Sequence, residues 1–223
     1  MRIRELKIYS ENFEDQNIFY REIIGLKLIE SSDFQSVFEI GSSNLRIVRN
    51  ENFSPYHFAI NIPCNMEFHA LKWLKERVRI LTVGNIEIQN FDFWNAKAIY
   101  FYDMDQNIIE FIARKNLKNK ATDSFNINSL IEISEIGVPV NDIKTVYTDI
   151  RKTVELKIFD GGFERCCAIG DERGLFICVN KKVKNWFPTG DQAYSSEFEV
   201  KIIENGIYYN LKFKNQKISA TSV

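Results

Sequence analysis

Residues 95–114, NAKAIYFYDMDQNIIEFIAR, contain two apolar segments on either side of a short acidic turn. Segments of this length, rich in β-branched and aromatic residues and separated by a turn, predict a β-hairpin. One carboxylate, Glu110, interrupts the second segment between Ile109 and Phe111. A carboxylate buried in a sheet is costly unless it meets a cation, a hydrogen-bond donor or a metal ion. Glu110 is therefore the first candidate functional residue.

The predicted hairpin closes a unit that the chain contains twice in succession. Residues 3–50 predict a strand, a helix and three further strands, and residues 57–114 predict the same order. The first helix, within residues 12–25, ends at a glycine, and the second, within residues 65–78, has an apolar stripe at helical spacing. The order β-α-β-β-β in both units predicts an α+β fold assembled from repeats.

The pattern then restarts in a shorter form. Residues 130–180 predict a third strand-helix-strand unit, and residues 198–213 predict a hairpin around Asn205-Gly206 with no helix of normal length. We therefore expect a first module of two units at 1–115, a polar linker at 116–128, a second, reduced module at 129–213, and a tail at 214–223 that frays.

Composition excludes several classes of partner. The 29 basic residues nearly balance the 30 acidic ones, so nucleic acid is not expected as a partner. No apolar segment is long enough to cross a bilayer, and the N-terminal residues do not resemble a signal peptide, so no membrane association is expected. The four cysteines lack metal-ligand spacing and suit reduced thiols in a cytoplasmic protein.

Three segments carry a resemblance to a known family. Residues 17–28, NIFYREIIGLKL, residues 100–111, YFYDMDQNIIEF, and residues 170–180, GDERGLFICVN, with the later NWFPTG, resemble motifs of the vicinal oxygen chelate superfamily, the glyoxalase, bleomycin-resistance and extradiol dioxygenase group. The third segment resembles longer bacterial members. Met104 and Gln106 replace the proline and glycine that are commonest in the family's turn. The resemblance implies paired β-α-β-β-β modules that form cupped mixed sheets.

The resemblance also implies a metal in the cup, with ligands from the first and last strands of each unit. Carried over to this chain, the ligands would be Glu5, His57 and Glu110. Alternate residues of a strand share a face, so each of these side chains can point into the cup while its apolar neighbours point away. One imidazole nitrogen and two carboxylate oxygens suit a divalent ion such as Fe, Mn, Zn or Ni.

Arg46 falls where Glu110 falls when the two units are aligned. Glyoxalase-type enzymes have a carboxylate at that position, whereas the dioxygenase type uses three protein ligands. An arginine there leaves three alternatives open: it repels the ion, it pairs with Glu5 in place of a metal, or it binds an anionic substrate. In the third unit we align Phe176 with this position, and Glu135 lies at the first-strand position without a matching histidine. We therefore expect no equivalent site in the second cup.

The expected site residues follow from this alignment. Glu110 and the possible proton donor Tyr9 are the catalytic candidates, and the substrate-binding candidates are Arg46, Lys7 and Asn61. The resulting hypothesis is a metal-dependent lyase or dioxygenase of glyoxalase type that acts on a small oxygen-rich molecule, as a monomer or a homodimer. The alternative is a non-catalytic, resistance-type protein that binds a small molecule without metal, and a third reading is a structural remnant.

Overall fold

The computed structural model describes residues 1–223, and its first two units match the predicted order of elements, with extra short strands in the second. The first unit comprises β1 (Arg2–Ser10), α1 (Phe13–Ile18), a π-helical turn (Phe19–Ile23), β2 (Lys27–Ser31), β3 (Gln35–Ile40) and β4 (Ser43–Arg49). The second comprises β5 (His57–Ile62), α2 (Glu67–Lys75), β6 (Ile80–Leu81), β7 (Gln89–Phe91), a 3-10 turn (Asp92–Trp94), β8 (Ala96–Tyr102) and β9 (Ile108–Arg114).

The second half of the chain is shorter. After two 3-10 turns (Lys115–Leu117 and Ile127–Ser129), the third unit comprises β10 (Glu132–Val140), α3 (Ile143–Arg151), β11 (Ile158–Gly161), β12 (Cys166–Asp171) and β13 (Gly174–Asn180). The fourth has no helix and comprises β14 (Phe198–Glu204), β15 (Ile207–Lys214) and β16 (Lys217–Ser222). The expectation of a frayed tail was wrong, because β16 pairs with β15 and buries Ile218. None of the helices is long and apolar enough to cross a membrane.

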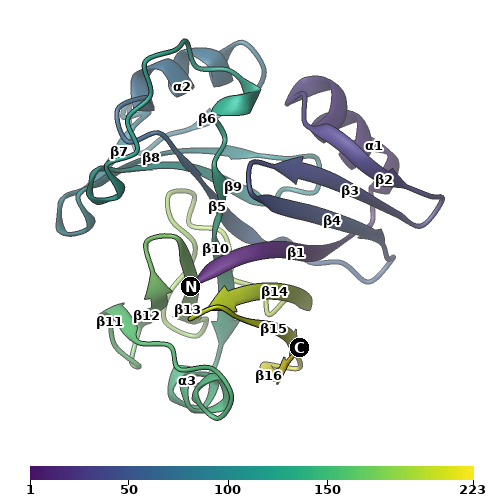
Figure 1. Cartoon of the computed structure of the whole chain (residues 1–223), viewed down its shortest axis with the longest axis vertical. Helices are drawn as coiled ribbons and strands as arrows, with labels where there is room; N and C mark the ends of the chain where they lie inside the picture. The colour runs from purple at the N-terminus through teal and green to yellow at the C-terminus, as the bar shows by residue number, and fades with distance from the viewer.

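The four units pair to form two mixed sheets (Figure 1). One sheet has the strand order β16-β15-β14-β1-β4-β3-β2, and the other has the order β11-β12-β13-β10-β5-β9-β8-β6, with β7 beside β8. The predicted α+β class with cupped mixed sheets is confirmed. The pairing differs from the expected one, because β1 joins β14 and β5 joins β10. Each sheet thus combines one unit from each half of the chain.

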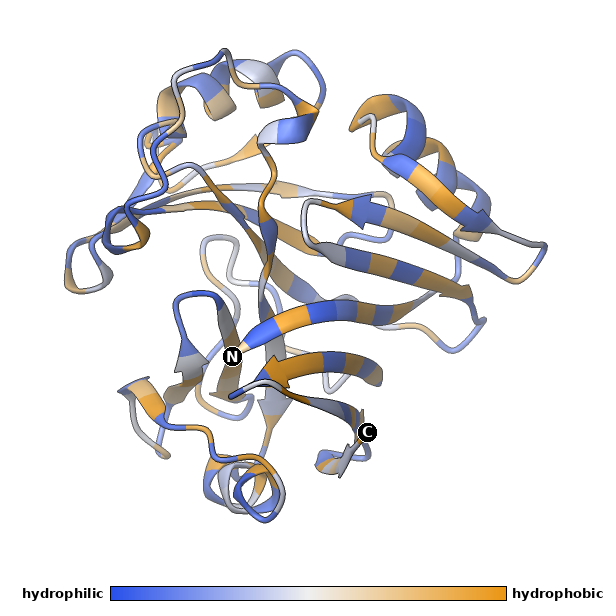
Figure 2. Cartoon of the chain, in the orientation of Figure 1, coloured by the Kyte–Doolittle hydropathy of each residue, from blue (hydrophilic) through white to orange (hydrophobic).

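The burial pattern explains how the sheets are positioned. β1, β4 and β14 alternate between apolar and polar residues, as Figure 2 shows, so each has one buried face. Every residue of β5, β9 and β10 is buried, which indicates that these three strands are covered on both faces. Their apolar face belongs to a core of 47 buried residues that spans both sheets. Their other face carries the polar residues of the candidate site.

The acidic turn between β8 and β9 is held by hydrogen bonds to the first unit. Tyr20 donates to Asp103 at 2.6 Å, and Gln16 donates to Asp105 at 2.8 Å. Gln16 lies in α1, and Tyr20 lies in the π-helical turn that follows it. These hydrogen bonds therefore connect the first helix to the second unit. Gln106 has a φ of +61°, a left-handed conformation that glycine adopts most easily. Gln106 therefore adopts in this turn a conformation that favours glycine.

Candidate metal centre and ligand pocket

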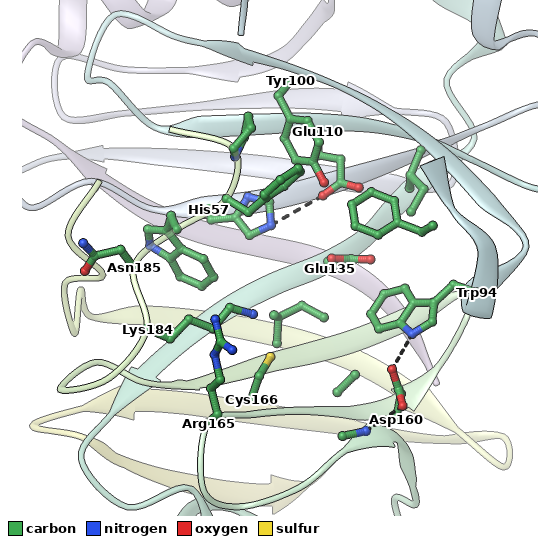
Figure 3. Close-up of a pocket in the computed structure, with 18 of the residues that line it drawn as sticks. His57, Trp94, Tyr100, Glu110, Glu135, Asp160, Arg165, Cys166, Lys184 and Asn185 are labelled. Atoms are coloured by element: carbon green, nitrogen blue, oxygen red, sulfur yellow. Dashed lines mark hydrogen bonds and ion pairs between the residues drawn. The ribbon is translucent and has the colours of Figure 1, made fainter. Parts of the chain in front are cut away.

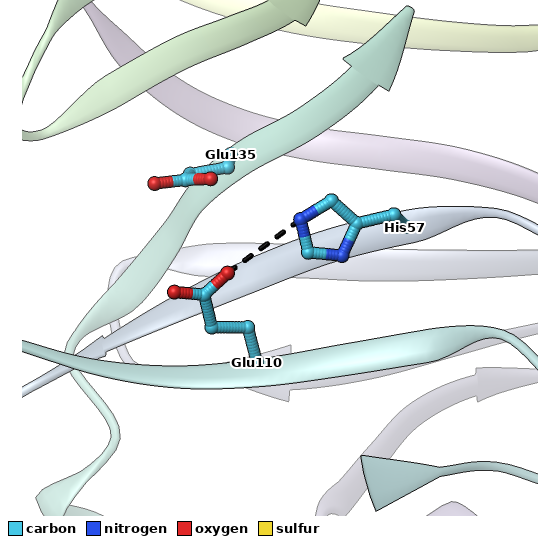
Figure 4. A group of neighbouring side chains, drawn as sticks. All are labelled: His57, Glu110 and Glu135. Carbon is cyan, nitrogen blue, oxygen red and sulfur yellow. Dashed lines mark ion pairs between the residues drawn. The ribbon is translucent and has the colours of Figure 1, made fainter. Parts of the chain in front are cut away.

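Three buried side chains from neighbouring strands converge on one point (Figure 4). His57 is the first residue of β5, Glu110 lies in β9, and Glu135 lies in β10. One possible ligand atom from each lies within 4.8 Å of the others. Both glutamates are only 3% exposed. The cluster therefore places two acids and an imidazole together in an environment with little water.

The register of the sheet explains the convergence. β5 lies between β9 and β10, and Ala59 is paired with Glu110 on one side and with Glu135 on the other. His57 is two residues from Ala59 and so lies on the same face. The small side chain of Ala59 leaves space between the two carboxylates. A single position of the central strand thus sets the distance across the site.

Hydrogen bonding determines which nitrogen of His57 faces the acids. Nδ1 lies 3.1 Å from the backbone carbonyl of Ile108, which can only accept a hydrogen bond, so Nδ1 carries the proton. Burial lowers the pKa of His57 to about 4, so the ring is neutral near pH 7. Nε2 therefore presents a lone pair toward Glu110, whose Oε2 lies 3.5 Å away. This orientation is the one that a metal ligand requires.

The two glutamates differ in their partners. Burial and the charge of Glu135 raise the pKa of Glu110 well above its usual value, and the Tyr100 hydroxyl is its hydrogen-bond donor. Burial also raises the pKa of Glu135, and the charge of Arg114 partly offsets this effect. Arg114 is fully buried and forms an ion pair with Glu135. The charge of Arg114 therefore acts on both Glu110 and Glu135.

The donor set fits a divalent cation. Nε2 of His57 and the carboxylate oxygens of Glu110 and Glu135 are all electron-pair donors that face one another, so a proton or a cation is needed between them. The position on β13 that corresponds to Glu110 is Ile177, because Gly137 pairs with Ile177 as Ala59 pairs with Glu110. The three side chains thus form a three-ligand set with an apolar residue at the fourth position.

The cluster opens into a large cavity with a volume of about 740 Å³ (Figure 3). A wall of aromatic side chains surrounds it: Phe91, Phe93, Trp94, Tyr100, Trp186 and Phe187. Trp186 lies over the backbone of Gly137, where a Cβ atom would be 2.7 Å from its ring. The ring centroid of Trp186 lies 4.9 Å from that of His57. The site is therefore a partly open, mostly apolar pocket with the acids and the imidazole at one end.

Known proteins with similar sequences or structures were compared with this chain. No protein-family model matches the chain. The metallothiol transferase FosB of Staphylococcus haemolyticus is 29% identical over 99 residues, which cover 41% of this chain and 68% of that protein. A putative dioxygenase from Bacillus subtilis superposes over 100% of this chain and 84% of its own, with a TM-score of 0.64 and 10% identity. Glyoxalase I from Zea mays, as a V278E mutant, superposes over 99% and 92%, with a TM-score of 0.59 and 12% identity.

The chain has the vicinal oxygen chelate fold. The fold that the resemblance implies is thereby confirmed, because two structures that superpose over nearly the whole chain, one named as a putative dioxygenase and one as a glyoxalase I mutant, share it.

Within the vicinal oxygen chelate fold, the expected trio of Glu5, His57 and Glu110 does not form. Glu5 lies on β1, in the other sheet, where it pairs with Arg46 at 3.2 Å and with Lys201 at 2.9 Å. The cause is the pairing of units: β5 meets β10 instead of β1, so Glu135 takes the place expected for Glu5. Phe176 also lies on the opposite face of β13, in the core, and Ile177 takes its expected position.

The other candidates on the first strand remain with Glu5. Lys7 pairs with Glu199 at 3.3 Å, and Lys7 also lies 5.5 Å from the centre of the Tyr9 ring. Arg46 forms an ion pair with Glu30 as well as with Glu5. In the register of the sheets, Arg46 lies opposite Lys7, just as Glu110 lies opposite Ala59. None of these residues lines the large pocket. The predicted alignment of Arg46 with Glu110 is correct, but the two residues belong to different cups.

Asn61 lies on β5 behind the site and does not line the pocket. Its Oδ1 accepts a hydrogen bond of 3.2 Å from Nε of Arg114, and its Nδ2 donates one of 3.0 Å to the carbonyl of Glu172. It therefore positions the arginine that pairs with Glu135. The sequence reasoning missed Arg114, and the signal was available: Arg114 is four residues after Glu110 on the same strand and so shares its face.

Proposed function

We propose that this protein is a metal-dependent enzyme of the vicinal oxygen chelate type, with His57, Glu110 and Glu135 as the ligands of one divalent ion. The observation that carries this proposal is the cluster of three facing electron-pair donors at one end of a 740 Å³ pocket. One nitrogen and two carboxylate ligands suit Fe, Mn, Zn or Ni. The names of the relatives, a metallothiol transferase and a dioxygenase, support a metal-dependent reaction on a small molecule.

When bound, a divalent ion supplies Lewis acidity toward substrate oxygen atoms. The chain's own residues do the remaining work. Trp186 is buried beside His57 and shields the donor cluster on that side, and Ile177 supplies no donor atom at the remaining strand position. The pKa of the Tyr100 hydroxyl is raised well above its usual value by burial and by the charge of Glu110, so this group stays protonated and can donate a hydrogen bond. Arg114 holds Glu135 in place.

Elemental analysis tests the metal site. We expect the purified wild-type protein to carry about one divalent ion per chain after metal supplementation, and His57→Ala and Glu110→Gln to carry little or none. His69→Ala is the matched control, because His69 is the only other histidine and lies exposed on α2. Equal metal contents in the wild type and in both site variants would refute the assignment of the ligands.

Metal affinity is expected to rise with pH below and near neutrality. Glu110 binds its proton more tightly than usual because of burial and of the charge of Glu135, and the metal requires the ionised form, so binding releases a proton. The affinity therefore increases until the pH exceeds the raised pKa of Glu110 and then becomes constant. His57, with a pKa of about 4, is already neutral and adds no pH dependence near pH 7.

Calorimetric titration with Zn²⁺ or Mn²⁺ in two buffers of different ionisation heat measures the protons released. His69→Ala should release the same number as the wild type, because that exposed residue is remote from the donors. A metal affinity that does not depend on pH between acidic and neutral conditions would contradict the predicted state of Glu110.

A metal-free binding protein is the second candidate function. The buried pair of Arg114 and Glu135 supports it, because the guanidinium already supplies a positive charge beside the site. This candidate predicts a pocket that binds its ligand equally well in the wild type and in His57→Ala. Metal-free wild-type protein after supplementation, together with ligand-dependent thermal stabilisation, would favour it over the enzyme.

A further inference from the structure

Two basic side chains, Arg165 and Lys184, line the large pocket away from the metal ligands (Figure 3). Arg165 precedes β12, and Lys184 follows β13, so two different loops bring the two cations to the same wall. Neither side chain forms an ion pair or donates a side-chain hydrogen bond within the protein. Arg165 is exposed at the mouth of the pocket, and Lys184 is half-buried. The pocket thus has two cations without an acidic partner on one wall of a mostly apolar lining.

The acidic groups of the pocket are all engaged elsewhere. Glu110 and Glu135 belong to the donor cluster, and Asp160 accepts hydrogen bonds from Nε1 of Trp94 at 2.6 Å and from its neighbour's backbone N–H at 2.8 Å. Figure 3 shows Asp160 beneath Trp94, apart from the two basic side chains. Lys184 is half-buried and lines the same pocket as His57. The pair of cations thus faces the cavity without an internal counterion.

The rest of the wall is largely aromatic, and several of its rings contact one another. Phe187 packs edge-to-face against Phe91, with centroids 5.9 Å apart, and against Tyr100, with centroids 5.7 Å apart. Trp94 packs in the same manner against Phe159 at 5.3 Å. Such rings bind flat apolar surfaces with little loss of conformational entropy. The cavity, at about 740 Å³, has the size of a small-molecule site.

We propose that the ligand of this pocket is a planar, largely apolar molecule that carries an anionic group, with the anion bound between Arg165 and Lys184 and the apolar body against the aromatic wall. This inference deepens the proposed function, since it uses the same pocket, but it does not require a metal. Charge-assisted hydrogen bonds to a carboxylate are stronger than neutral ones, so the anion sets the orientation of the ligand. The opposite end of the molecule then faces His57 and the two glutamates.

Two probes of the same shape test this proposal: naphthalene-2-carboxylate, which is an anion, and naphthalene-2-carboxamide, which is neutral. Both are titrated into the full chain after its metal has been removed with a chelator and the chelator dialysed away, with quenching of tryptophan fluorescence and calorimetry as readouts. We expect the carboxylate to bind the wild type at least about tenfold more tightly than the amide, the effect of one charge-assisted hydrogen bond. High salt should reduce this preference, because it screens the partly exposed cations.

The double variant Arg165→Gln/Lys184→Gln should lose the preference while binding the amide as the wild type does. Lys157→Gln/Lys182→Gln is the matched control, because it removes the same charge at two exposed positions outside the pocket. Equal affinity of the wild type for both probes, or a preference that survives in the Arg165/Lys184 variant, would overturn the proposal. Because metal-free protein is used throughout, this result does not depend on whether His57, Glu110 and Glu135 bind a metal. Equally, a negative result here would not refute the metal site.

Discussion

Glu135→Gln is expected to lower the affinity of the protein for Zn²⁺ or Mn²⁺ by about 100-fold or more, whereas Glu5→Gln leaves it unchanged. Even residues that only contact metal ligands change affinity by about 10- to 100-fold, so loss of a charged ligand should have at least this effect. Glu135 lies in the donor cluster, while Glu5 lies in the other sheet with Arg46 and Lys201. Competition with a chromophoric chelator measures both affinities.

Glu5→Gln is a well-matched control for Glu135→Gln. Both changes convert a first-strand glutamate to its amide, and Arg46 keeps its second ion pair with Glu30 when Glu5 is altered. Unfolding by denaturant should show that both variants remain folded before affinities are compared. Strong loss of metal binding in Glu5→Gln with no loss in Glu135→Gln would restore the site expected from the sequence and refute the one assigned here.

The order of elements could be predicted from the sequence because it depends on local patterns. Alternation of apolar residues, the helix-ending Gly25 and the turn at Asn205-Gly206 all act within a few residues of chain. The pairing of units depends instead on contacts between strands far apart in the sequence. The expected pairing of the first two units and the observed pairings of β1 with β14 and of β5 with β10 all join apolar strands. Hence the fold was predicted correctly, whereas Glu5 was wrongly predicted to join His57 and Glu110 in place of Glu135.

A signal for the correct pairing exists in the charges. Residues 5–7 read Glu-Leu-Lys, and residues 199–201 read Glu-Val-Lys. In an antiparallel arrangement these triplets place Glu5 opposite Lys201 and Lys7 opposite Glu199, which is the register of β1 and β14. Opposite charges across neighbouring strands stabilise a sheet, whereas β5 offers His57 and Asn61 at its polar positions and no comparable partners for β1.

Arg114→Met is expected to destabilise the metal-free protein by about 3 to 5 kcal/mol, the typical effect of removing one partner of a buried ion pair. Arg114 and Glu135 are both almost fully buried, and Nε of Arg114 is held by Asn61. Without the guanidinium, the charge of Glu135 has no protein cation nearby, and the cluster would contain two acids beside a neutral imidazole. Chemical denaturation of chelator-treated protein measures this loss.

A divalent ion should restore much of the lost stability, because it supplies positive charge at the same place. Metal addition is therefore expected to raise the Tm of Arg114→Met by more than that of the wild type. The double variant Arg114→Met/Glu135→Gln should be more stable than the sum of the two single changes predicts, since it buries no unpaired charge. If the metal stabilises both proteins equally and the two changes are additive, Arg114 does not share the electrostatic environment of the metal site. In that case the guanidinium would serve only as a buried contact that links β9 to β10 across β5.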